Sequence, residues 1–146
     1  MSTTNDLRIY SKQLLQAVQA LDSLLDQVTA ARNPGELKDV PSQSQAILAG
    51  LSETQSGLQA AAEGGLETKP DPDEARRGIA FTVAELPLEP TIEALREVPR
   101  LVEKAIAQQS DHAVVLVPLC LAYRHCIEAM RPLAAAVDPR HLSNER

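Results

Sequence analysis

The fold is decided by residues 7–31, which read LRIYSKQLLQAVQALDSLLDQVTAA. Two apolar series repeat through this stretch at seven-residue intervals: Leu7, Leu14, Leu21 and Val28, and, three positions on, Tyr10, Ala17, Leu24 and Ala31. A heptad with two apolar positions, kept over about four repeats, is typical of a helix in a coiled coil or an antiparallel bundle. Asn33-Pro34-Gly35 ends the pattern with helix-breaking residues. We therefore predict one long amphipathic helix at the start of the chain.

The composition also favours helices. Hydrophobic residues make up 44% of the 146 residues, but only 2% are aromatic, so the core must be aliphatic. Leu and Ala dominate it, and both are strong helix formers. A chain of this length is most simply one domain. We expect a single helical bundle domain over residues 1–140 and a disordered tail over residues 141–146.

A second helix is predicted to begin at Ser42, after Pro41, and to end at Gly64-Gly65. Its inward stripe follows the helical repeat: Ile47, Leu51, Thr54, Leu58 and Ala61. Glu53 is the single charged residue between Ser42 and Ala62. The outer surface of this helix should therefore be almost uncharged.

Small residues form another stripe on this second helix, at Ala46, Gly50, Gly57 and Ala60. They lie roughly 80° around the helix from the apolar stripe, at 100° per residue. Each glycine costs about 1 kcal/mol relative to alanine in a helix, so a compensating close contact is expected. That contact can lie within the chain or with another chain. These four residues are our candidates for contact with a partner.

The middle of the chain is punctuated by prolines. Gly64 to Asp73 is predicted as a linker, followed by a third helix that starts at Pro72. Ile79, Val83 and Leu86 have helical spacing, but residues 78–86 also alternate like a strand. Both structures remain open for residues 78–86, and helix is preferred because a lone strand leaves its backbone groups unpaired.

A fourth helix is predicted from about Pro90 to Gln109, with a kink at Pro99. Its inward positions are Ile92, Leu95, Val98, Val102 and Ile106.

The last helix is predicted from about Ser110 to Val137, and Pro118 and Pro132 can divide it into two segments. The run Ala113–Ala122 is apolar on all sides, which predicts a helix surrounded by others. Farther on, one face is expected to hold Leu116, Tyr123, Ile127, Met130, Ala134 and Val137. The predicted fold is all-α, an antiparallel bundle of four to five helices with proline-interrupted C-terminal helices.

Cys120, His125 and Cys126 form the densest group of potential metal ligands. On a helix, however, Cys120 and His125 point about 140° apart, and the two cysteines about 120° apart. They cannot bind one ion together, so we predict no metal site and expect the cysteines to behave as small apolar residues. His125 is expected on the surface. An exposed histidine on a bundle is also a feature of phosphotransfer domains, but Glu128 lies one turn on, where a cation would serve better.

Catalytic motifs are not evident. Glu67, Asp71, Asp73 and Glu74 lack the spacing of a calcium loop, and we find no phosphate loop or nucleophile elbow. We predict no catalytic residue and no cofactor. Whether the protein is an enzyme stays uncertain, and the sequence leans against it.

The net charge of −6 is spread evenly along the chain. Without a basic patch or aromatic stacking surface, the sequence argues against nucleic-acid binding. The apolar run Ala113–Ala122 is shorter than the roughly 20 residues that span a bilayer, so no membrane insertion is predicted. No signal peptide is visible, which favours the cytoplasm, with export by a signal-less route left open.

The leading hypothesis for function is a non-catalytic helical module that binds a protein partner or itself, with a homodimer as one form. One alternative is a small-ligand-binding bundle, or a minor enzyme, with a pocket near Tyr123, Arg124 and His125. Another alternative is an exported effector or accessory protein.

Overall fold

In the computed structural model of the chain, residues 3–66 and 72–137 are described. Within these ranges the chain forms five α-helices and two short 3₁₀ helices, and no strand. They are α1 (Thr3–Ala30), η1 (Pro34–Leu37), α2 (Val40–Leu66), α3 (Pro72–Glu85), α4 (Leu88–Gln108), η2 (His112–Val115) and α5 (Leu116–Val137). The predicted all-α class is confirmed. The predicted tail over residues 141–146 lies outside the described residues.

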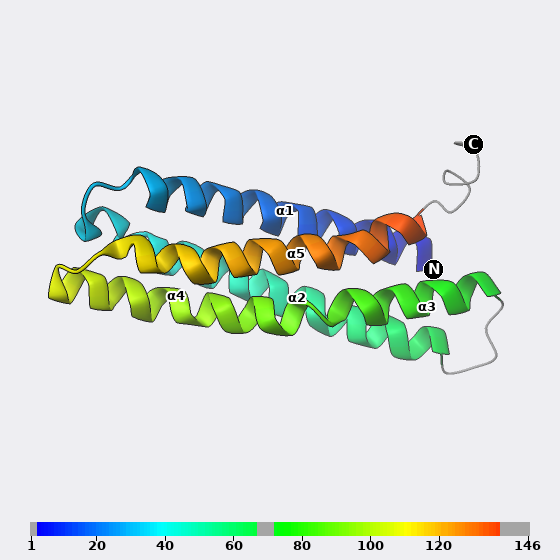
Figure 1. The fold of residues 1–146 in the computed structure, drawn as a ribbon. Coiled ribbons are helices and arrows are strands. Elements are labelled where there is room, and N and C mark those ends of the chain that lie inside the picture. Colours follow the sequence, from blue (N-terminus) through cyan, green and yellow to red (C-terminus); the bar gives the residue numbers. More distant parts are fainter. Residues whose placement is uncertain (1–2, 67–71, 138–146) are drawn as a thin grey trace.

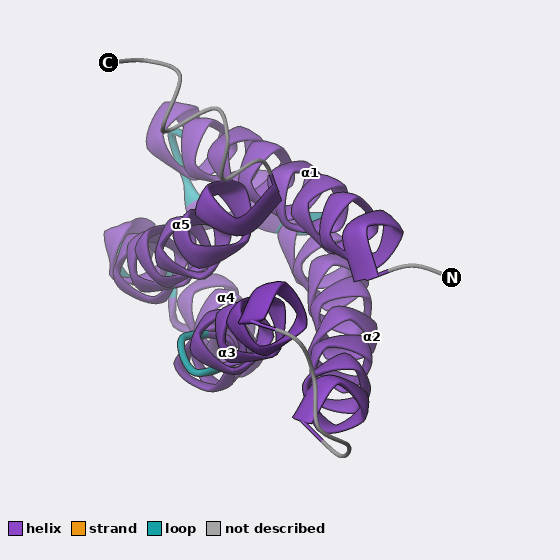
Figure 2. Cartoon of the chain, turned by 90° about the vertical axis from the view of Figure 1, so that its right-hand side faces the viewer, coloured by secondary structure: helices purple, strands orange, loops and turns teal. Residues whose placement is uncertain are grey.

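The helices form an antiparallel bundle with four sides. α1 and α2 run in opposite directions, α3 and α4 follow one another along a third side, and α5 returns along the fourth (Figure 1). Seen end-on, α3 and α4 share one corner of the bundle (Figure 2). α1 packs against α2 and α5, and both α3 and α4 pack against α2 and α5. Each side of the bundle therefore has two neighbouring sides and one face open to solvent.

The heptad of α1 points into the core as predicted. Leu14, Leu21, Leu24 and Val28 are buried, and Tyr10 and Ala17 are partly buried against them. The turn after α1 also contributes to the core, because Pro34 and Leu37 of η1 are buried. The predicted end of the first helix before Asn33-Pro34-Gly35 is confirmed, because α1 ends at Ala30.

α2 carries the predicted inward stripe, with Leu51, Thr54 and Leu58 buried. It begins at Val40, two residues before the predicted start at Ser42, and ends at Leu66, one residue beyond Gly64-Gly65. Two glycines weaken a helix by about 1 kcal/mol each, but they terminate it only where the chain adopts a left-handed conformation. No described glycine has a positive φ. The predicted linker therefore begins later than Gly64.

Residues 78–86 are helical up to Glu85, which settles the choice between helix and strand. The core side of α3 holds Phe81 and Ala84, and the Phe81 ring meets the Tyr10 ring edge-on with centroids 5.9 Å apart. The apolar residues with helical spacing lie on the opposite side. Ile79, Val83 and Leu86 are 57%, 43% and 65% exposed.

α4 begins at Leu88, two residues before the predicted start, and continues through Pro99. Ile92, Leu95, Val98 and Val102 are buried, as predicted, and Ile106 is partly buried. The helix ends at Gln108, and its C-cap is Gln109, a non-glycine residue with φ 50°. The backbone N–H of Ser110, the next residue, donates to the Ala105 carbonyl at 3.1 Å and closes the last turn.

The last predicted helix divides before Pro118, at the junction of η2 and α5, and not at Pro132, which lies inside α5. Pro118 falls in the first turn of α5, where a missing N–H leaves no helical bond unmade. The predicted inward face is displaced by about one position. The buried residues of α5 are Pro118, Leu119, Ala122, Cys126, Ala129, Leu133 and Ala136.

Residues of the predicted inward face are less buried. Tyr123, Ile127 and Met130 are partly buried, Ala134 is exposed, and the side chain of Val137 is outside the described set. The prediction that Ala113–Ala122 is surrounded by helices is wrong, because Val114, Val117 and Leu121 are exposed.

One helical stretch of the described residues, His112–Ala136, is long and apolar enough to cross a membrane by length and composition. This is weak evidence for a span, since the core helix of a soluble protein passes the same test. About a third of its most apolar window is buried inside the bundle. The shorter run considered in the sequence, Ala113–Ala122, lies within this stretch.

Candidate functional surfaces

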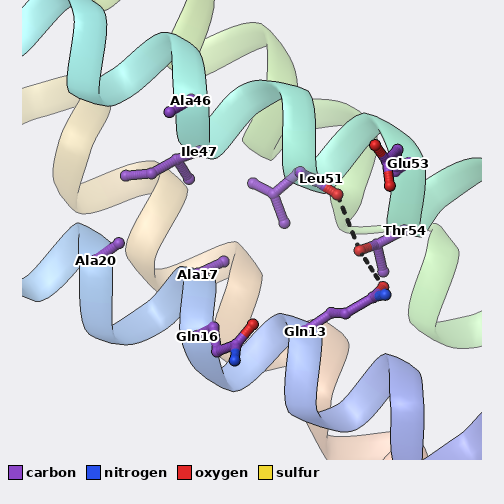
Figure 3. A pocket seen from close by; sticks show the side chains of 10 residues that line it. Gln13, Gln16, Ala17, Ala20, Ala46, Ile47, Leu51, Glu53 and Thr54 are labelled. Atoms are coloured by element: carbon purple, nitrogen blue, oxygen red, sulfur yellow. Dashed lines mark hydrogen bonds between the residues drawn. The ribbon is translucent and has the colours of Figure 1, made fainter.

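A groove runs between α1 and α2 on the outside of the bundle (Figure 3). Its volume is about 360 Å³. It is lined by residues of both helices, most of them small or polar and two of them large and apolar (Ile47 and Leu51): Gln13, Gln16, Ala17, Ala20, Ala46, Ile47, Gly50, Leu51, Glu53 and Thr54. Two of the four predicted partner-contact residues, Ala46 and Gly50, therefore lie in one surface groove.

The glycines of α2 differ in what lies over them. A Cβ added at Gly50 would meet nothing within 4 Å, so this position is open. A Cβ at Gly57 would lie 2.7 Å from the Tyr10 ring, so Gly57 makes its close contact inside the chain. Ala60 is exposed. Of the predicted stripe, Ala46, Gly50 and Ala60 are therefore exposed, and Gly57 is covered by Tyr10.

A polar contact crosses the groove at one end. The Thr54 hydroxyl lies 2.7 Å from Oε1 of Gln13 and 3.0 Å from the carbonyl oxygen of Gly50, so it can donate to either (Figure 3). Thr54 is buried, and this contact ties α1 to α2. The groove exposes no large apolar side chain, so a partner seated in it would gain little hydrophobic stabilisation.

A second surface is formed by the start of the last helical segment. Val114, Val117 and Leu121, here called the α5 ridge, are 47%, 62% and 45% exposed. They are spaced by three and four residues, which places them along one side of a helix. Beside them lies a shallow, almost wholly apolar hollow of about 370 Å³, lined by Leu116, Val117, Cys120, Leu121 and Arg124.

Opposite charges lie at the two ends of the α5 ridge. Asp111 precedes it and accepts a hydrogen bond from the Ala113 N–H at 2.9 Å, which caps η2. Arg124 follows it on the next turn and is exposed. Among the described residues no ion pair is formed by Arg124, whereas Arg100 pairs with Glu97. The ridge is therefore an apolar strip with an acid at one end and an unpaired base at the other.

The solvent-exposed face of α4 differs from the α5 ridge in its charge. The outer residues of α4 are exposed and charged: Glu93, Arg96, Glu97, Arg100, Glu103 and Lys104. α3, which continues the same side of the bundle, instead exposes Ile79, Val83 and Leu86. Apolar exposure is thus confined to particular segments and is not a general property of the surface.

The predicted pocket residues are only partly brought together. Tyr123 and Arg124 line a shallow hollow of about 320 Å³ with Ile127, Glu128 and Arg131. His125 is not part of its lining, and its Nδ1 lies 3.1 Å from Oε1 of Glu128. The described lining comes from α5 alone.

The two cysteines lie in different environments. Cys126 is buried, and its thiol faces the Leu14 carbonyl oxygen at 3.7 Å. Burial raises the pKa of the Cys126 thiol from 9.0 to about 12, so the thiol is neutral at physiological pH. Cys120 is exposed, so of the two cysteines Cys126 alone lies in the core as a small apolar residue. Within the described part of the chain no three metal-ligating side chains gather at one place.

His112 joins η2 to the residue after α1 at one end of the bundle. Its Nε2 lies 3.0 Å from the carbonyl oxygen of Ala31, the residue after α1. The sequence predicted only a helix from about Ser110, and η2 begins nearby at His112, with Asp111 as its cap. The long-range contact had no local signal, because the two residues are 81 positions apart.

The α5 ridge was missed from the sequence, although its signal was present. The all-round apolar character of Ala113–Ala122 was assigned to burial, and the structure shows that part of it faces outward. Comparison of the chain with protein-family models, with curated proteins and with solved structures gives no match.

Proposed function

We propose that this chain is a non-catalytic helical module that binds a protein through the α5 ridge. The observation that carries the proposal is the outward exposure of Val114, Val117 and Leu121 on a segment whose other side forms the core. Exposed apolar side chains that lie in a row are a common feature of interaction sites. The outer face of α4 is the internal comparison, because most of the residues that it exposes to solvent are charged.

The α5 ridge exposes more large apolar side chains for a partner to bury than the groove between α1 and α2 does. Fully burying a Val or Leu side chain contributes about 1.5–3 kcal/mol, and each ridge residue is about half exposed. Covering all three would therefore contribute on the order of 2–4 kcal/mol. The groove between α1 and α2 exposes no side chain of this kind to the same extent, because Ile47 is partly buried and Leu51 is buried.

A photocross-linking experiment tests the proposal. The photoreactive residue p-benzoylphenylalanine replaces Val117 in one variant and Ile9 in a control. Ile9 is another exposed large apolar residue, on α1 and outside the ridge. Irradiation in extract of the producing cells should give discrete protein adducts, with this chain or with another, from position 117 and not from position 9. Equal adduct patterns from both positions would contradict the proposal.

A further inference from the structure

We infer that the partner of the α5 ridge is a second copy of this chain, paired antiparallel across a two-fold axis between residues 117 and 118. This inference rests on the proposed function and adds the identity of the occupant and the register. It is argued from the order of residues along the ridge and from their charges.

The ridge is symmetric about the midpoint between residues 117 and 118. Reversing a second copy about this point places Val114 opposite Leu121 of the other copy, and Val117 beside the second Val117. The same register places Arg124 opposite Asp111 of the other copy, at both ends of the contact. All five side chains are exposed in the single chain. A two-fold contact of this kind is closed and does not extend into a filament.

Charge selects the antiparallel arrangement. A parallel pair would bring the two Arg124 side chains together and the two Asp111 side chains together, which is unfavourable at both ends. The antiparallel pair matches acid with base twice. Because each chain carries a net charge of −6, two copies repel in general, and an apolar strip with balanced charges at its ends is a favourable place for them to meet.

The other exposed surfaces fit a second copy less well. The apolar row of α3 ends at Leu86, in the turn between α3 and α4, so it does not continue along one helix. The groove between α1 and α2 has Glu53 as its one charged residue and no base to match it. The α5 ridge is short, and a standard interface covers about 800 Å² per partner, so the dimer should be weak and depend on concentration.

Disulfide cross-linking tests the register. In a Cys120→Ser background, Cys126 is buried, so an added cysteine is the reactive thiol among the described residues. In the inferred pair, two copies of residue 117 are offset by about 1.5 Å along the axis, and packed helices lie about 8–10 Å apart, which allows a disulfide. Two copies of residue 121 are offset by about 10 Å, which does not allow one.

Val117→Cys should therefore form a disulfide-linked dimer at least about 10-fold faster than Leu121→Cys under mild oxidation. The double variant Val114→Cys/Leu121→Cys should cross-link as fast as Val117→Cys, since those positions face each other. Equal rates for the two single variants would overturn the inference, because random collision does not distinguish the positions. If that result came with foreign adducts from p-benzoylphenylalanine at position 117, the ridge would bind another protein and only the inference would fail.

A charge exchange provides a second readout of the same pair. Arg124→Asp should weaken dimer formation at least about 10-fold, because it places two acids together at each end. Adding Asp111→Arg to the same chain should restore it. Asp111→Ala is the control for the lost helix cap, since alanine does not cap η2. Failure of the double variant to dimerise, while the Asp111→Ala protein folds normally, would exclude this register.

Discussion

Tyr10 of α1 lies directly over Gly57 of α2. A Cβ at Gly57 would lie 2.7 Å from both Cε1 and the hydroxyl oxygen of the Tyr10 ring. The other side of the contact is fixed as well, because the Tyr10 ring meets the Phe81 ring of α3 at an interplanar angle of 88°. Tyr10 therefore joins three helices at one point, and the absence of a side chain at residue 57 makes this contact possible.

Gly57→Ala should destabilise the protein by about 1–3 kcal/mol, the usual range for overpacking a core. Alanine is the better helix former by about 1 kcal/mol, but the added methyl group displaces Tyr10 from Gly57 and Phe81. Gly50→Ala is the matched control, since nothing lies within 4 Å of its Cβ position. It should stabilise the protein by about 0.5–1 kcal/mol. Urea denaturation measures both, and changes of the same sign would contradict the assigned role of Tyr10.

The buried thiol of Cys126 should make the protein less stable at alkaline pH. Its pKa is about 12 in the folded chain and 9.0 when unperturbed, so the unfolded chain releases this proton first as the pH rises. The stabilising contribution is complete below pH 9 and is lost as the pH approaches 12. Between pH 8 and pH 10.5 the loss should be about 2 kcal/mol.

Cys126→Ala isolates this effect, because the Tyr and Lys residues titrate in both proteins. The variant should be less stable near pH 8, where a buried side chain has been shortened. Its free energy of unfolding should then fall less steeply toward pH 10.5 than that of the unmodified protein. Parallel pH profiles would show that the thiol at residue 126 is not the group responsible.

His112→Ala should lower the free energy of unfolding by about 0.5–1.5 kcal/mol, the usual net contribution of one hydrogen bond. The variant loses the contact between Nε2 and the Ala31 carbonyl, which connects η2 to the end of α1. His125→Ala is the control, because its contact with Glu128 is near the surface and local. That change should cost less than about 0.5 kcal/mol. Equal losses in thermal or urea denaturation would remove the special role of His112.

The sequence predicted the fold best where one face of a helix is apolar and the other polar. In α1 a strict heptad fixes the inward face, so Leu14, Leu21 and Leu24 were placed correctly. In α5 the apolar residues surround the helix, so periodicity could not identify the inward side. The core side there combines the small residues Ala122 and Ala129 with Leu119 and Leu133, while Val117 and Leu121 face outward.

The same limitation explains α3. Ile79 and Val83 are larger than Ala84, yet Ala84 faces the core and they do not. The reason is Phe81, which shares the inner face with Ala84 and packs against Tyr10. Only the packing partner, which is distant in sequence, decides between the two faces. For the candidate site, the small residues Ala46 and Gly50 were identified as a group. Whether they are covered depends on the position of α1, which no local pattern specifies.

The role of the α5 ridge is tested most directly by sedimentation equilibrium of the unmodified protein, Val117→Asp and Ile9→Asp. Both substitutions replace an exposed apolar side chain with an acid, but only residue 117 lies in the ridge. We predict a concentration-dependent dimer for the unmodified protein and for Ile9→Asp, and a monomer throughout the same range for Val117→Asp. The same distribution of species for all three proteins would contradict the assignment of the ridge as the surface that joins two copies.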